Sequence, residues 1–476
     1  MKALTSIATG FAILTLALSG CSGSKSRASS STVAPATSGT GGTTSSTLPG
    51  VTPGQPPVGT WWKGDMHSHS APYSQDAQRQ FGDSPGTCFF LAETAGLDYL
   101  ALTDHRTLDQ VNDPTYHANT LTILDGTEWG GTTHHGFVGL TQAVNGLDPS
   151  LGANTLNAQM QQAYDEVHRQ GAIVIANHPT DPDKVHIWLS HTYEAVEVWN
   201  AYWNIPSFKD ASDQDIDDKL NGEGLAQIGE SANPEIREAV KHRGAGPNHQ
   251  AIKFWEANLN RGRHMAAVGG GDRHSIVFPG LPTTYVFAPT QSRADLLQAV
   301  KQGRTWVGSY QGPQVEFTAD ADQDGVFESM LGDSVPLNRP VNYKVRIQNG
   351  QGGKVEIIKN GTLFQTFALL SNDDTFSFTD TASSQSWYRV DVFEPVNFQI
   401  PNSNGFQILA LTGSLFGQSG MTALATIATP GGFQVSLGTT RAPIIRLPHE
   451  YDVILNFDRA HWGYARGAIT SPIWAE

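Results

Sequence analysis

The chain has 476 residues, of which 45 are acidic and 30 are basic, so its formal net charge is −15 at pH 7. Nonspecific nucleic-acid binding depends on clustered Lys and Arg, and this charge balance argues against a nucleic-acid partner. The length that follows a polar N-terminal region suggests two folded domains.

The N-terminus carries the pattern of a secretory signal peptide over residues 1–21. Lys2 is followed by an apolar stretch from Ile7 to Leu18, too short for a convincing membrane span, and then by Ser19-Gly20-Cys21. This ending resembles the lipobox of bacterial lipoproteins, in which the cysteine is lipidated. We therefore expect export, a membrane anchor at Cys21, and a location in the bacterial cell envelope.

Residues 22–59 are rich in Ser, Thr, Gly and Pro and cannot bury enough apolar area to fold, so they predict a disordered tether. With Cys21 used by the anchor, Cys88 has no cysteine left to pair with, and no internal disulfide is expected. Cys88 lies in an apolar run, which favours a buried thiol.

From residue 60 to 310, apolar runs alternate with helical patterns, which predicts an α/β domain with a parallel sheet or a closed barrel. The predicted strands are Lys63–His67, Asp98–Thr103, Leu121–Leu124, Gly136–Leu140, Ala172–Ala176, Ala195–Trp199, Met265–Val268 and Thr283–Phe287. The predicted helices are Leu156–Arg169, Ala251–Asn260 and Arg293–Gln302. The polar stretch Lys209–Arg243 is interpreted as an insertion.

Residues 311–476 predict a second, β-rich domain resembling a β-sandwich. Short strands are expected at Val315–Ala319, Val341–Gln348, Lys354–Lys359, Thr375–Thr379 and Trp387–Phe393. Asn360-Gly361 between two of the runs is a strong hairpin signal.

Most apolar runs of the first domain lead into a histidine or an acid. In a barrel of parallel strands, the carboxyl ends of the strands are where sites are built. Imidazole and carboxylate together suit Zn²⁺, Mn²⁺ or Fe²⁺, and the lack of thiolates argues against a structural zinc site. The segments concerned are Asp65–His69, Asp104-His105, Asp125–Glu128, His134-His135, Asn177-His178 and Asp272–His274.

In combination, these segments resemble the successive motifs of the PHP (polymerase and histidinol phosphatase) superfamily. Further details are similar to its CehA/McbA-like branch, namely Ser74-Gln75-Asp76, Glu197-Val198-Trp199-Asn200, Gly280–Val286 and Gly303–Trp306 followed by Gly312-Pro313. The resemblance covers about Trp61 to Gly312. It implies a distorted (β/α)7 barrel that holds two or three divalent metal ions, Zn²⁺, Mn²⁺ or Fe²⁺.

The resemblance also implies a set of metal ligands. These are His67, His69, Asp76, His105, Glu128, His134, His178, Asp272 and His274. His134 is preferred to His135 because the family places this ligand five residues before a glycine, and Asp76 depends on the alignment of a short loop. Asp104 is expected to orient an imidazole or a water.

Two arginines near these ligands, Arg106 and Arg273, are candidates to hold an anionic substrate group. The chain departs from the family at Gly271, where a serine is usual, and at Arg106, which places the substrate in doubt. The expected function is hydrolysis of a small phosphoester by a hydroxide that bridges two metals. The alternatives are a carboxylic ester, amide or carbamate hydrolase with the same metals, or a non-catalytic metal- or glycan-binding lipoprotein.

Two other motifs resemble functional sites but lack a residue that the site needs. Ser84 lies in a Gly-x-Ser-x-Gly pattern, but Pro85 removes the N–H that an oxyanion hole needs, so we reject it as a nucleophile. Asp320-x-Asp322-x-Asp324-Gly325 resembles the start of a calcium loop, yet Leu331 stands where the twelfth-position Glu belongs. The sequence therefore favours a plain acidic turn.

Overall fold

The computed structural model describes residues 55–79, 82–130, 134–145, 153–179, 193–201, 247–274, 279–310, 312–395, 407–412, 423–428 and 464–476. The predicted signal peptide, Cys21, most of the predicted tether and the predicted insertion lie outside these residues. All of the described residues belong to one compact unit of the chain, residues 47–476. Within the described part of the chain, each helix is too short or too polar to cross a membrane.

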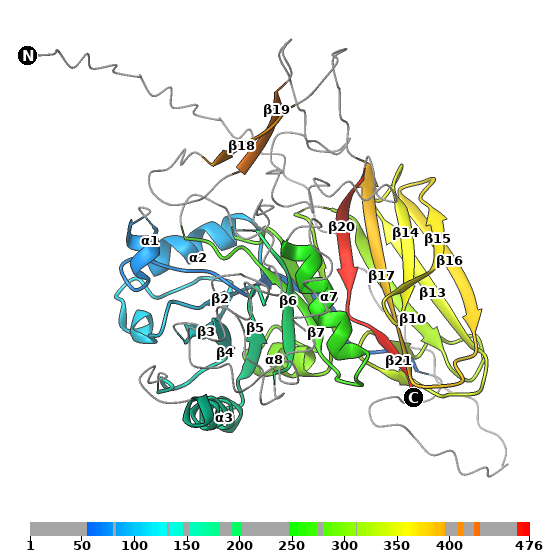
Figure 1. Cartoon of the computed structure of the whole chain (residues 1–476), viewed down its shortest axis with the longest axis horizontal. Helices are drawn as coiled ribbons and strands as arrows, with labels where there is room; N and C mark the ends of the chain where they lie inside the picture. The colour runs from blue at the N-terminus through cyan, green and yellow to red at the C-terminus, as the bar shows by residue number, and fades with distance from the viewer. Residues whose placement is uncertain are drawn as a thin grey trace, which may run out of the picture. The chain divides into compact units, whose positions relative to one another are not determined.

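The fold is mixed α/β, with a large curled sheet and a second, smaller sheet (Figure 1). The first half of the chain supplies one side of the large sheet, in the order β9-β8-β1-β2-β3-β4-β5-β6-β7. These strands are β1 (Thr60–Asp65), β2 (Tyr99–Leu102), β3 (Thr122–Trp129), β4 (His135–Val138), β5 (Ile173–Ala176), β6 (Ala195–Asn200), β7 (Ala266–Gly270), β8 (Thr283–Ala288) and β9 (Thr305–Gly308).

The sheet departs from the expected parallel arrangement at β4 and at β8. Strands β1, β2 and β3 are parallel to one another, as are β5, β6 and β7, but β4 is antiparallel to both of its neighbours. Only five residues separate β3 from β4, and a parallel pair needs a crossover of about a dozen residues or more. Strand β8 is likewise antiparallel to β1.

The large sheet curls until β7 lies against β8 and β9, and hydroxyl side chains bind the backbone edge of β7. Thr284 Oγ1 accepts a hydrogen bond from Gly269 N at 2.8 Å, and Thr305 Oγ1 donates to Ala267 O at 2.7 Å. Ser471 Oγ accepts from Ala267 N at 2.8 Å. Backbone groups that a flat sheet would leave unpaired are thereby satisfied, which gives a half-barrel in place of an open edge.

Helices cover the outer face of this half-barrel, where α7 packs on β6 and α8 packs on β8 (Figure 1). The helix α8 buries Leu296, Leu297 and Val300 on the side that faces the sheet. The described helices are α1 (Gln75–Arg79), α2 (Pro85–Thr94), α3 (Ala153–Arg169), α7 (Pro247–Leu259) and α8 (Arg293–Lys301).

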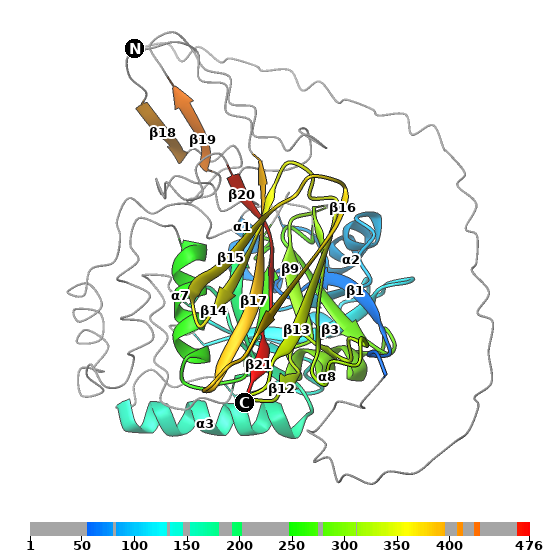
Figure 2. The same cartoon turned by 90° about the vertical axis from the view of Figure 1, so that its right-hand side faces the viewer.

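The second half of the chain is β-rich, and part of it extends the large sheet. Strand β20 pairs with β9, and the order continues β20-β17-β21-β12, with β14 also on β17 and β15 on β14 (Figure 2). These strands are β12 (Ser334–Val335), β14 (Lys354–Lys359), β15 (Thr362–Ala368), β17 (Ser386–Pro395), β20 (Tyr464–Thr470) and β21 (Ile473–Ala475). The predicted Asn360-Gly361 hairpin is confirmed, because β14 and β15 pair antiparallel around it with both turn residues at positive φ.

A second sheet runs in the order β11-β10-β13-β16. Its buried side chains share one core with β14, β17 and β21, including Phe317, Tyr343, Val355, Tyr388 and Ile473. Its strands are β10 (Gln314–Asp320), β11 (Ser329–Met330), β13 (Val341–Gln348) and β16 (Asp373–Asp380), and a separate pair is formed by β18 (Gln407–Thr412) and β19 (Ala423–Ala428).

Candidate metal centre

The nine predicted metal ligands come from separate segments and meet in one cluster, in which six of them are buried. His67 and His69 follow β1, His105 follows β2, and His178 follows β5, each just beyond the carboxyl end of its strand. Asp272 and His274 follow β7 in the same way. Parallel strands direct their carboxyl ends to one side of a sheet, which explains why residues far apart in the sequence converge.

The remaining three predicted ligands reach the cluster by other routes. Asp76 lies in the first turn of α1, and His134 directly precedes β4. Glu128 lies inside β3, which runs beyond the predicted Leu121–Leu124 to Trp129. The sequence therefore identifies Glu128 as a candidate but misplaces it as a residue after the end of its strand.

One group of ligand atoms surrounds the two histidines that follow β1. The Nε2 atoms of His67 and His69 are 3.1 Å apart, and His69 Nε2 is 3.1 Å from Asp272 Oδ1. His67 Nε2 is 3.4 Å from Glu128 Oε1. One donor atom from each of these four side chains lies within 4.8 Å of the other three.

A second group of ligand atoms shares His69 with the first. Asp76 Oδ2 is 2.7 Å from His105 Nε2 and 3.0 Å from His274 Nε2. The rings of His69 and His274 stack with their centroids 4.2 Å apart. Donor atoms of His69, His105 and His274 also lie within 4.8 Å of one another.

Glu128 lies at the centre of the cluster. Its Oε1 is 3.0 Å from His134 Nδ1 and 3.0 Å from His178 Nε2, while its Oε2 is 3.1 Å from His105 Nδ1. The two oxygens of one carboxylate thus face different sets of imidazoles. This arrangement is suited to a carboxylate that bridges two metal ions, a role that its position in the sequence does not indicate.

The spacing of the donors fits transition-metal ions. Zn²⁺ binds imidazole nitrogen and carboxylate oxygen at about 2.0–2.2 Å, so neighbouring ligands in a tetrahedral site lie roughly 3.4 Å apart. The distances between donor atoms in the cluster are close to this value. Three overlapping groups, built from His67, His69, Glu128 and Asp272, from His69, His105 and His274, and from His105, Glu128 and His134, could each hold one ion.

The electrostatics of the cluster require positive charge in its interior. Burial alone would raise the pKa of Glu128, but the charges of His134, His67 and His105 hold it well below its usual range. Burial alone would lower the pKa of His67, but Asp272, Glu197 and Glu128 raise it well above 6.5. Metal cations would supply this charge in place of protons on the imidazoles.

His69 differs from His67, because burial and the charges of His274 and His105 lower its pKa from 6.5 to about 3. A neutral imidazole has a free nitrogen lone pair, which is the form that binds a metal.

A second layer of polar side chains fixes the orientation of the histidines. Glu197 Oε1 is 3.0 Å from His67 Nδ1, and Glu197 Oε2 accepts hydrogen bonds from His178 N and Asn200 Nδ2 at 2.8 and 2.9 Å. Partners of this kind hold metal-binding imidazoles in a fixed orientation. Glu197 and Asn200 lie in β6, and neither is among the predicted site residues.

Asp104 acts on the cluster through a serine. Ser74 Oγ donates to Asp104 Oδ1 at 2.8 Å and is 3.0 Å from His69 Nδ1. Ser70 contributes its N–H and its hydroxyl to the same carboxylate at 2.6 and 2.7 Å. Burial raises the pKa of Asp104 to about 6. Asp104 is thus connected to the His69 imidazole through Ser74, and its orienting role stays a prediction.

Asp65 connects the ends of two strands. Its carboxylate accepts hydrogen bonds from the backbone N–H groups of His67, Gly271 and Gly280 at 3.0, 3.0 and 2.8 Å. It is buried, and burial raises its pKa to about 6. Asp65 therefore aligns the histidines after β1 with the Asp272 segment after β7.

Strained backbone is concentrated at the cluster. Arg106, His134, His178 and Asp272 have φ values of 56°, 30°, 25° and 46°. Positive φ is costly for residues with bulky side chains and persists where the surroundings impose it, often at functional sites. Three of these residues are predicted ligands, and the fourth follows His105.

The two candidate arginines differ in their surroundings. Arg106 is exposed, and its backbone N–H donates to Glu128 O at 3.0 Å, which places this residue beside the cluster. The guanidinium of Arg273 is buried, forms an ion pair with Asp83, and donates to Cys88 Sγ at 3.3 Å. The structure thus gives Arg273 a bracing role where the sequence suggested contact with a substrate anion.

The residues that were set aside as nucleophiles have structural roles. Ser84 caps the N-terminus of α2 and accepts a hydrogen bond from Thr87 N. Cys88 is a buried free thiol, as predicted, and burial raises its pKa to about 12. A thiol with so high a pKa is not a nucleophile at neutral pH.

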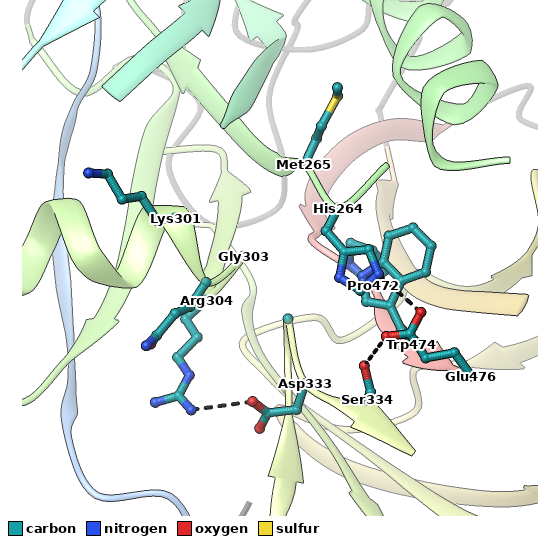
Figure 3. A pocket seen from close by; sticks show the side chains of 12 residues that line it. His264, Met265, Lys301, Gly303, Arg304, Asp333, Ser334, Pro472, Trp474 and Glu476 are labelled. Atoms are coloured by element: carbon teal, nitrogen blue, oxygen red, sulfur yellow. Dashed lines mark hydrogen bonds and ion pairs between the residues drawn. The ribbon is translucent and has the colours of Figure 1, made fainter. Parts of the chain in front are cut away.

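A separate pocket of about 310 Å³ lies at the opposite end of β7, next to His264 and Met265 (Figure 3). Its wall includes the ring of His264 stacked on Trp474 with centroids 3.9 Å apart, and Arg304 paired with Asp333 at 3.3 Å. None of the predicted site residues lines it. The metal cluster and this pocket are therefore distinct features.

No protein-family model and no curated protein sequence matches this chain. A two-domain protein from Bacteroides vulgatus that contains a predicted PHP-like metal-dependent phosphoesterase is similar in structure, with 14% identity and a TM-score of 0.32 over 71% of this chain and 92% of that one. PsfC from Pseudomonas syringae is similar with 15% identity and a TM-score of 0.27, over 52% and 90%.

The CARDB domain of PF1109 from Pyrococcus furiosus matches 17% of this chain and 73% of its own, with 19% identity and a TM-score of 0.13. At these identities and TM-scores, the similarities do not establish a family or an activity for this chain.

Proposed function

We propose that this chain is a metal-dependent hydrolase of the PHP superfamily that acts on a small ester. The observation that carries the proposal is the set of three overlapping groups with ligand spacing that seven imidazole and carboxylate side chains form, two of which share Glu128. The resemblance of the successive segments to PHP motifs supports the same conclusion.

Metal ions bound by such donors lower the pKa of bound water toward about 7 and polarise the oxygen of a scissile carbonyl or phosphoryl group. The protein's own residues preorganise that chemistry. Glu197 holds His67, and Asp104 acts on His69 through Ser74, so that the ligands need little rearrangement. Preorganised polar groups of this kind act without a reorganisation cost during the reaction.

We further propose a phosphoester as the substrate, with Arg106 binding its anionic oxygens. Arg106 is exposed beside His105, and a guanidinium matches the geometry of phosphate oxygens. Because Arg273 is instead paired with Asp83, the rim of the site has one fewer cation than the sequence suggested. Because less positive charge is then available to bind an anionic substrate, a carboxylic or carbamate ester is the second candidate.

The test is metal analysis of the purified protein together with a screen of chromogenic phosphate and carboxylate esters. We expect more than one equivalent of transition metal, loss of activity with a chelator, and recovery with Zn²⁺ or Mn²⁺. Full activity in protein without metal would overturn the proposed function.

A comparison of Arg106→Ala with Arg106→Lys tests the substrate class. Arg106→Ala removes a charged hydrogen bond to the substrate and should therefore lower kcat/KM for a phosphate ester by roughly 10- to 100-fold. Arg106→Lys keeps the positive charge and should restore part of that loss. An equal effect on a neutral carboxylic ester, or turnover of aryl carbamates without aryl phosphates, would replace the phosphoester by the second candidate.

A further inference from the structure

The loop between β10 and β11 brings four carboxylates together, away from the candidate metal centre. Asp320 ends β10, Asp322 and Asp324 lie in the turn, and Glu328 directly precedes β11. One oxygen from each of these four side chains lies within 4.8 Å of the other three. The sequence motif contains the three aspartates, whereas the proximity of Glu328 to them is seen only in the folded chain.

Glu328 is the unusual member of this group, because it is only 5% exposed. Its Oε1 accepts a hydrogen bond from Ala321 N at 2.9 Å. Its Oε2 is buried and has no hydrogen-bond partner among the described residues. A buried carboxylate oxygen without a donor is costly, since buried polar atoms are almost always paired.

No basic side chain of the described residues forms an ion pair with any of the four carboxylates. The ion pairs of the second sheet involve other acids, such as Asp373 with Arg346 and Asp380 with Lys359. Four negative charges so close together repel one another, and two of the residues, Asp320 and Glu328, are buried. A cation at this position would offset the repulsion, and the described residues place no basic side chain in an ion pair there.

The backbone holds the carboxylates in place. Asp320 accepts from the N–H groups of Gln323 and Gly325 at 2.6 and 3.1 Å, and Asp324 Oδ1 accepts from Val326 N at 2.7 Å. Gly325 has a φ of 91°, which makes the sharp turn after the third aspartate. In known calcium loops a glycine at this sixth position serves the same purpose.

We propose that the Asp320–Glu328 loop binds one Ca²⁺ ion. All four donors are carboxylate oxygens, the ligands that hard cations prefer, and none is an imidazole or a thiolate. Ca²⁺ binds oxygen at about 2.3–2.6 Å, so ligands on opposite sides of the ion lie up to roughly 5 Å apart, which accommodates the spacing of these oxygens. Mg²⁺ requires shorter bonds of about 2.0–2.1 Å and stricter octahedral geometry.

Glu328, the ninth residue of the loop, replaces the glutamate that calcium loops carry at their twelfth position. The residue at the twelfth position, Leu331, is fully buried in the core of the second half of the chain and cannot be a ligand. The loop ends at β11, which pairs with β10 through Thr318 and Ala319. Calcium would therefore tie the two strands together and stabilise this edge of the second sheet.

The decisive experiment is a calcium titration of the full chain by isothermal calorimetry, with the protein as purified and with Ca²⁺ alone as the probe. The variant Asp322→Asn/Asp324→Asn removes two exposed charges and keeps the oxygens that accept from Asp324 N and Val326 N. Glu316→Gln, an exposed carboxylate on the same strand β10, is the matched control.

We expect the wild type and Glu316→Gln to bind one more equivalent of Ca²⁺ than the double variant, and Mg²⁺ to compete poorly. Equal calcium uptake by the wild type and the double variant would overturn the proposal, as would a lack of uptake at a few millimolar Ca²⁺, where known extracellular sites are filled. The comparison is a difference between variants, so Ca²⁺ that enters the candidate metal centre cancels.

Glu328→Gln provides a second measurement that does not depend on calorimetry. Without Ca²⁺, removal of the buried charge should leave the Tm equal to or above that of the wild type. With Ca²⁺, the wild type should gain Tm and the variant should not, so the order reverses. A Glu328→Gln variant with the same rise in Tm on adding Ca²⁺ as the wild type would contradict the site.

Discussion

At the scale of single residues, two neighbouring histidines show how the fold assigns different roles to the same side chain. His134 Nδ1 is 3.0 Å from Glu128 in the candidate metal centre. His135 is buried among aromatic rings, and its Nε2 is 2.9 Å from the hydroxyl of Tyr164. Burial and the charge of His134 lower the pKa of His135 to about 3, so it stays neutral in the core.

This difference predicts separate effects for the two alanine variants. His134→Ala should reduce the metal content and lower activity by at least about tenfold, because even second-layer partners of metal ligands cost that much. His135→Ala should keep the metal per folded molecule but lose about 1–3 kcal/mol of stability through the lost hydrogen bond and packing. The metal-to-protein ratio measures the loss of metal in each variant, and urea unfolding of the metal-free proteins measures the loss of stability. A similar loss of metal in both variants would contradict the assignment of His134, rather than His135, as the ligand.

At the scale of elements, a buried ion network connects α7 to the β-rich half of the chain. Arg389 of β17 contacts Glu256 of α7 at 2.7 Å and Asp391 at 2.8 Å. Arg466 of β20 contacts Asp391 at 2.6 Å. Burial alone would raise the pKa of Asp391, but the charges of both arginines hold it well below its usual range.

Asp391→Asn should therefore destabilise the protein by about 3–5 kcal/mol at pH 7, because it removes the negative charge that two buried arginines share. A carboxyl whose pKa is depressed by folding contributes stability above its unfolded pKa of 3.8 and loses it as the pH falls further. The difference between the wild type and Asp391→Asn should thus shrink between pH 5 and about pH 2.

Urea unfolding at several pH values measures this difference. Asp373→Asn is the control, since Asp373 pairs with Arg346 on the surface and such exposed pairs contribute little. A loss in Asp391→Asn no greater than in Asp373→Asn would show that Asp391 contributes no more to stability than an exposed pair does.

At the scale of the whole molecule, we propose that Cys21 anchors the chain to a membrane through a lipid. The proposal rests on the Leu18-Ser19-Gly20-Cys21 pattern and on the Ser-, Thr- and Gly-rich segment that follows it. Cys21→Ala should release the protein from the membrane fraction of the producing cells. Cys88→Ala removes the other cysteine and should remain in that fraction, and equal retention of both variants would contradict an anchor at Cys21.

The sequence alone indicated most of the candidate site. Strand ends followed by His67, His105, His178 or Asp272 could be recognised, because apolar runs and the polar residues after them are local features. The same local signals predicted β1 to β8 to within about five residues and the hairpin at Asn360-Gly361, but they did not predict β9 (Thr305–Gly308). The antiparallel β4 was missed because strand direction depends on pairing, which a single run of residues does not encode.

Only the tertiary structure decided how these side chains share their partners. Glu128 faces imidazoles on both oxygens because four other segments of the chain bring histidines to it, and the buried Arg273 forms an ion pair with Asp83. Glu328 joins the three aspartates by the return of β11 onto β10. Residue type and order along the chain determine which chemistry is available, whereas distances between residues distant in sequence arise only when the core packs.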